Sequence, residues 1–96
     1  MNTANLQLEG LYLALAAINR TLVNSGVLTA DQLDAALGDA AATAQRDGHD
    51  VSAANRDAVT FPIRFLRHAN RADGDGKTAT FSELARLVGE TSRLNW

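Results

Sequence analysis

Cysteine is absent from this 96-residue chain, proline occurs once, and aromatic residues make up only 5%. The lack of cysteine excludes disulfides, thiolate nucleophiles and cysteine metal ligands. Long hydrophobic runs are also missing, since the apolar run at residues 11–18 is far too short to span a bilayer. The first residues carry no basic cluster of the kind that begins a secretory signal. We therefore expect a cytoplasmic protein without a membrane partner.

The residues that are present have the proportions of a globular domain. Apolar residues account for 46% of the chain and charged residues for 21%, which is ordinary for a folded protein. Ninety-six residues are enough for one hydrophobic core, so we expect a single helical domain over residues 1–96. The abundance of alanine, and of arginine over lysine, suggests a bacterial or phage source.

Charge is distributed unevenly between the two halves of the chain. Residues 1–50 carry six acidic residues against two arginines, whereas residues 51–96 carry five acidic against seven basic residues. The second half is therefore the place to look for an anionic partner. The net charge of −2 is far from the strongly basic balance of a dedicated nucleic-acid binder.

Apolar spacing and capping signals indicate an all-α protein, a small four-helix bundle. The predicted helices cover residues 3–24, 30–46, 53–72 and 81–92. Two capping boxes, Thr29 with Gln32 and Thr80 with Glu83, mark the starts of the second and fourth helices. Pro62 lies inside the third helix, and we expect one helix that is kinked there rather than two separate helices.

The first predicted helix is apolar on two faces. One face has 3-4-3-4 spacing and consists of Leu8, Leu11, Leu15, Ile18 and Leu22. Leu6, Leu13 and Ala17 lie nearly opposite. Such a helix is either central in its own domain or shared with a partner. In the second case Leu6, Leu13 and Ala17 are the candidate homodimer seam.

Arginines form a stripe on the third predicted helix. Arg56, Arg64, Arg67 and Arg71 fall within roughly 80° of one another on a helical wheel. They suit an acidic protein surface, through bidentate pairs, or the phosphates of a nucleic acid. The simpler interpretation is a solvated face, paired in part with Asp57 and with the acidic first half of the chain.

The segment Asp73-Gly74-Asp75-Gly76-Lys77, followed by Phe81-Ser82-Glu83-Leu84, resembles the calcium loop of the EF-hand family. The resemblance implies that Asp73 and Asp75 are ligands and that Gly76 supplies the sharp turn. Arg71 stands where the family has its first ligand, and Glu83 comes one residue after the position of the bidentate glutamate. These departures favour a glycine-rich connector over a metal site at Asp73, Asp75 and Glu83.

Catalytic constellations are not evident in the sequence, which has two histidines and neither a phosphate-binding glycine loop nor a nucleophile elbow. We expect no enzyme activity and no cofactor. The leading hypothesis is a helical interaction or regulatory module that binds another protein or itself. The alternatives are a nucleic-acid-associated regulator that uses the arginine stripe and a degenerate EF-hand-like calcium site.

Overall fold

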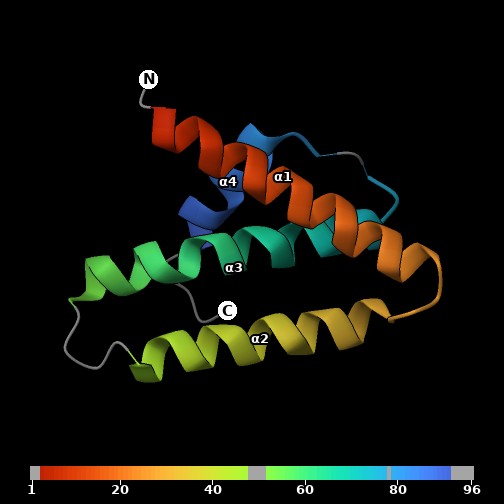
Figure 1. The fold of residues 1–96 in the computed structure, drawn as a ribbon, viewed down its shortest axis with the longest axis horizontal. Coiled ribbons are helices and arrows are strands. Elements are labelled where there is room, and N and C mark those ends of the chain that lie inside the picture. The colour runs from red at the N-terminus through yellow and green to blue at the C-terminus, as the bar shows by residue number, and fades with distance from the viewer. Residues whose placement is uncertain (1–2, 48–51, 78, 92–96) are drawn as a thin grey trace.

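The computed structural model describes residues 3–47, 52–77 and 79–91, and this part of the chain forms four α-helices without strands (Figure 1). The helices are α1 (Thr3–Asn24), α2 (Ala30–Asp47), α3 (Ala53–Gly74) and α4 (Phe81–Thr91). The predicted all-α four-helix bundle is confirmed. Two of the ends differ from the predicted ones, that of α2 by one residue and that of α3 by two, and Ser92, the predicted end of the fourth helix, lies outside the described residues.

Local hydrogen bonds explain where the helices begin. The Gln32 N–H donates to Thr29 Oγ1 at 3.0 Å, and the Thr29 N–H donates to Gln32 Oε1 at 2.8 Å. Thr80 and Glu83 exchange the same two bonds, each at 3.1 Å. Both capping boxes are therefore confirmed, and each satisfies backbone N–H groups that a helix start leaves without partners.

The centre of the bundle is α3, which packs against α1, α2 and α4, whereas α1 and α2 touch little (Figure 1). In Figure 1, α2 runs along one side of α3, while α1 crosses the other side with α4 behind it. Of the two interpretations of the first predicted helix, a central position in its own domain is therefore wrong. Among the four helices α1 is the most apolar and α3 the least. A ranking by hydrophobicity would therefore place α1 at the centre and α3 at the margin, which is the reverse of the structure.

The core lies between α1, α3 and α4. Phe65 and Val88 are completely buried, and an aromatic cluster surrounds Phe65. The ring centroid of Tyr12 lies 5.4 Å from that of Phe65 and 6.1 Å from that of Phe81. The ring centroids of Phe65 and Phe81 are 5.0 Å apart. Such ring pairs contribute about 0.5–1.5 kcal/mol each beyond their buried area. Tyr12 thus attaches one edge of α1 to the core.

Pro62 lies inside α3, which continues through it as one helix. The proline has no N–H to donate to the preceding turn. Side chains donate to two other carbonyls of the preceding turn: Thr60 Oγ1 to Arg56 O and Arg64 Nη2 to Asp57 O, each at 2.9 Å. The prediction of one helix rather than two is confirmed, while the kink at Pro62 stays a prediction.

Candidate interaction surface

The side of α1 that faces away from the bundle is apolar and exposed. Only Ala16 of this helix is buried. Six large aliphatic side chains leave between 38% and 55% of their surface accessible: Leu6, Leu8, Leu11, Leu13, Leu15 and Ile18. Figure 1 shows α1 at the margin of the fold, with α3 below it and α4 crossing behind it. The most apolar helix therefore presents much of its apolar surface to water.

These exposed side chains fall on two stripes, which we name by their residues. The outer seam consists of Leu8, Leu11, Leu15 and Ile18, within roughly 80° on the helix. The side stripe consists of Leu6, Leu13 and Ala17, the candidate homodimer seam. Leu6 and Leu13 are exposed, as that role requires, and Ala17 is partly buried.

The two stripes differ in the number of charged residues that lie close to them. Leu13 borders a groove of about 350 Å³ between α1, α3 and α4, and charged residues also line this groove: Arg20, Asp73 and Lys77. Arg20 Nη1 lies 3.8 Å from Asp73 Oδ1. Between Thr3 and Asn19 the only charged residue of α1 is Glu9, on the bundle side of the helix and nearly opposite the outer seam. The outer seam is consequently the uncharged one.

The exposed aliphatic area of α1 is comparable to the largest apolar patch of a typical monomer, which covers about 300–600 Å². We estimate that the six side chains of both stripes together expose on the order of 500 Å² of apolar surface. A stable interface buries about 800 Å² per partner. Two small exposed residues, Ala4 and Ala14, lie on or beside the outer seam and extend this face.

The arginine stripe does not form one exposed surface, so the expectation of four arginines presented together to a partner is wrong. Arg56 and Arg71 are exposed, but Arg64 is buried and Arg67 is largely covered. The stripe runs along the side of α3 that faces α2. It contributes to packing between these helices and leaves its two ends accessible.

Arg67 holds α2 against α3. Its Nε donates to Asp34 Oδ1 at 3.0 Å and its Nη2 to Asp34 Oδ2 at 2.9 Å, a bidentate pair. The hydrogen bond from Arg67 is the main reason that the pKa of Asp34 is lowered. Asn70 adds a second link, since its Nδ2 donates to Ala30 O at 2.9 Å. The expected pairing of the stripe with the acidic first half of the chain is thus confirmed at Arg67.

Arg64 and His68 are polar residues in the interior. Nε of Arg64 has no hydrogen-bond partner among the described residues, although its Nη2 bonds to Asp57 O. Burial lowers the pKa of His68, and the charges of Arg71, Arg64 and Arg67 lower it further. His68 is thus an interior residue whose surroundings favour the neutral imidazole.

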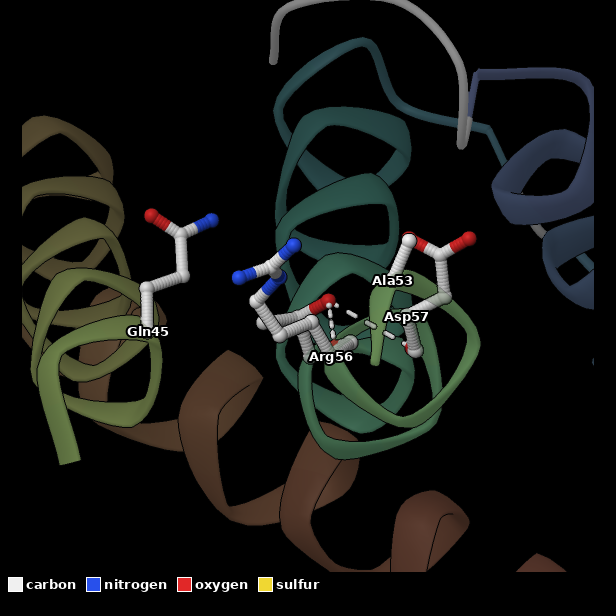
Figure 2. Close-up of a pocket in the computed structure, with 5 residues that line it drawn as sticks. Gln45, Ala53, Arg56 and Asp57 are labelled. Carbon is white, nitrogen blue, oxygen red and sulfur yellow. Dashed lines mark hydrogen bonds between the residues drawn. The ribbon is translucent and has the colours of Figure 1, made fainter. Parts of the chain in front are cut away.

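Arg56, the exposed residue at the start of the stripe, lines a shallow pocket of about 340 Å³. Figure 2 shows Gln45 of α2 on one side of this pocket and Arg56 and Asp57 of α3 on the other. Thr60 also lines it, and its hydroxyl is bonded to backbone oxygens of the preceding turn. The pocket combines one guanidinium, one carboxylate and one amide, a set of groups that selects no single class of ligand.

Two of the three candidate metal ligands, Asp73 and Glu83, use their carboxylates in other interactions, and Asp75 caps a helix through its backbone. Asp73 pairs with Arg20, and the Asp75 N–H caps the end of α3 by donating to Arg71 O at 3.0 Å. Hydrogen bonds from the backbone and hydroxyl of Thr80 lower the pKa of Glu83. Within the described ranges, no group of three or more histidine, aspartate or glutamate side chains is placed to hold a metal ion. The loop acts structurally as a capped connector between α3 and α4.

Comparison with protein-family models, curated proteins and solved structures finds no match to this chain. Among the described residues, every helix is too short or too polar to cross a lipid bilayer.

Proposed function

We propose that this chain is a non-enzymatic helical module that associates with a second copy of itself through the outer seam of α1. The observation that carries the proposal is the exposure of Leu8, Leu11, Leu15 and Ile18 on the most apolar helix, while the least apolar helix lies at the centre. The largest exposed apolar patch of a monomer is often a functional surface.

A second copy is the partner that this surface fits best. The 3-4-3-4 spacing of the outer seam is the pattern by which one helix packs against another of the same kind. Residues beside the seam, Gln7, Tyr12, Ala14 and Asn19, carry no charge. An identical face therefore meets no like-charge repulsion, and no charged patch calls for a complementary partner. Pairing two such faces doubles the apolar area removed from water.

Neither alternative function gains comparable support. Nucleic-acid binding by the stripe needs several accessible arginines, but Arg64 is buried and Arg67 is paired with Asp34. Calcium binding needs carboxylates that converge, yet Glu83 caps α4 and Asp73 pairs with Arg20. The outer seam has no such competing role within the described residues.

Light scattering on a size-exclusion column tests the proposal across protein concentrations from about 1 to 200 μM, a range suited to micromolar self-association. We expect dimers at the upper concentrations. The double variant Leu11→Glu with Ile18→Glu should be monomeric, because each carboxylate would be desolvated in an apolar contact. Both positions are exposed in the single chain, so the helical circular dichroism signal should be retained.

Two control variants identify the responsible face. Val59→Glu changes an equally exposed aliphatic residue on α3, outside the seam, and should leave the dimer intact. Leu6→Glu with Leu13→Glu tests the side stripe in the same way. A wild-type monomer throughout the concentration range would refute self-association. Dimer loss confined to the Leu6 and Leu13 variant would move the interface to the side stripe.

A further inference from the structure

The direction in which two copies pair is a further step, and it rests on the proposed self-association. We infer that the two α1 helices pack antiparallel about residue 13. In this arrangement Leu11 lies opposite the partner's Leu15, and Leu8 lies opposite the partner's Ile18. Each copy then contributes all four residues of the outer seam to two distinct kinds of contact layer, each occurring twice by symmetry.

The identities of the seam residues favour this direction. With 3-4 spacing, Leu8 and Leu15 occupy the first position of the repeat, and Leu11 and Ile18 occupy the second. Parallel two-stranded coils favour a β-branched residue at the first position and leucine at the second. Here the β-branched residue, Ile18, stands at the second position. Antiparallel packing sets first against second positions, so Ile18 meets a leucine of the other copy.

The extent of the helix agrees with the centre of the seam. α1 runs from Thr3 to Asn24, so its midpoint lies between residues 13 and 14. The outer seam, from Leu8 to Ile18, is centred on residue 13. An antiparallel pair in this register therefore overlaps along the whole of both helices, without an unpaired apolar overhang at either end.

Helix dipoles supply a third reason. α1 has no acidic residue in its first turn and no basic residue in its last turn, so its own side chains do not balance the dipole. Antiparallel pairing places the positive end of each helix beside the negative end of the other. Parallel pairing brings like ends together, and the uncharged flanking residues offer no ion pair to offset the repulsion.

Cysteine cross-linking tests whether the two α1 helices pair antiparallel. Because the chain has no native cysteine, only the introduced residues can form disulfides. Leu8→Cys and Ile18→Cys are prepared separately, then incubated alone or mixed in a glutathione redox buffer. In the antiparallel register residue 8 faces the partner's residue 18, while the two copies of residue 8 are about 15 Å apart along the axis. Disulfides require Cα atoms within roughly 7 Å. The mixture should therefore give about tenfold more covalent dimer than either variant alone.

Each other result overturns the inference in a recognisable way. Covalent dimer from Leu8→Cys alone shows a parallel pair, and self-association then stands without the antiparallel direction. No cross-link in any sample, with wild-type protein dimeric by light scattering, places the interface elsewhere. No cross-link with wild-type monomer refutes the proposed function itself. Light scattering on each reduced variant checks that the cysteine substitution has not abolished the dimer.

Discussion

Arg67 and Asp34 are 33 residues apart in sequence, yet they form a bidentate pair between α3 and α2. Because the two halves of the chain carry opposite net charges, the sequence predicts that some arginine of the second half pairs with an acidic residue of the first. The choice of partners was not predictable, because it depends on how the two helices are rotated against each other. The same limit applies to Arg64, which a helical wheel places on a charged face but the fold buries.

His68 should make the stability of the domain depend on pH near neutrality. Its pKa is lowered in the folded state from an ordinary value of 6.5, chiefly by burial. The unfolded histidine therefore takes up a proton first as the pH falls, so acid favours unfolding. This contribution to stability is complete above about pH 6.5 and is lost below it, with a slope of at most about 1.4 kcal/mol per pH unit.

Urea unfolding at pH 5, 6 and 7 measures this effect. We expect His68→Gln to flatten the dependence, and His49→Gln, which removes the other histidine of the chain, to retain it. Asp34 does not interfere, because its pKa is lowered from 3.8 and its contribution is lost only at more acidic pH. An equally steep dependence in His68→Gln would assign the effect to other groups.

At the scale of single helices, the sequence predicted the boundaries well. The capping residues Thr29 and Thr80 contact groups three positions along the chain, so local sequence contains the whole signal. The placement of each helix in the bundle was predicted poorly. α1 has apolar residues on two faces, and only its packing shows that Tyr12 and Ala16 face the core while Leu11 and Ile18 do not.

Gly38 gives a prediction about α2. A Cβ at this position would lie 3.6 Å from the two terminal nitrogens of Arg67, which is an ordinary contact. Alanine also has a higher helix propensity than glycine. Gly38→Ala should therefore raise the free energy of unfolding by about 0.5–1 kcal/mol, as measured by urea denaturation.

Gly26→Ala is the matched control, with an expected change of the opposite sign. Gly26 ends the turn after α1 at a φ of 81°, which a residue with a side chain adopts only with strain. We expect this variant to lose about 1 kcal/mol. A loss of stability in Gly38→Ala would mean that Arg67 and Asp34 cannot accommodate the added methyl group.

At the scale of the whole molecule, apolar and polar surface are distributed unusually. α3 buries Thr60, Arg64, His68 and Asn70 at the centre, while α1 carries aliphatic side chains at the margin. Hydrophobic patterning assumes that the most apolar helix is the most covered one. That assumption holds for this molecule when a second copy covers the outer seam of α1. The exposure of α1 in the single chain is therefore the main indication that the chain forms a dimer.

Thermal stability should therefore depend on protein concentration. Because only folded chains present the outer seam, dimer formation stabilises the native state by mass action. A hundredfold rise in concentration above the dissociation constant adds about 2.7 kcal/mol per dimer, or about 1.4 kcal/mol per chain. For a domain of this length we expect Tm to rise by about 5–10 °C, as measured by circular dichroism.

Leu11→Glu with Ile18→Glu should give a Tm that does not change with concentration, whereas Val59→Glu should keep the wild-type dependence. A concentration-independent Tm in the wild type, over the range where light scattering shows dimers, would mean that the association does not draw on the folded α1 surface.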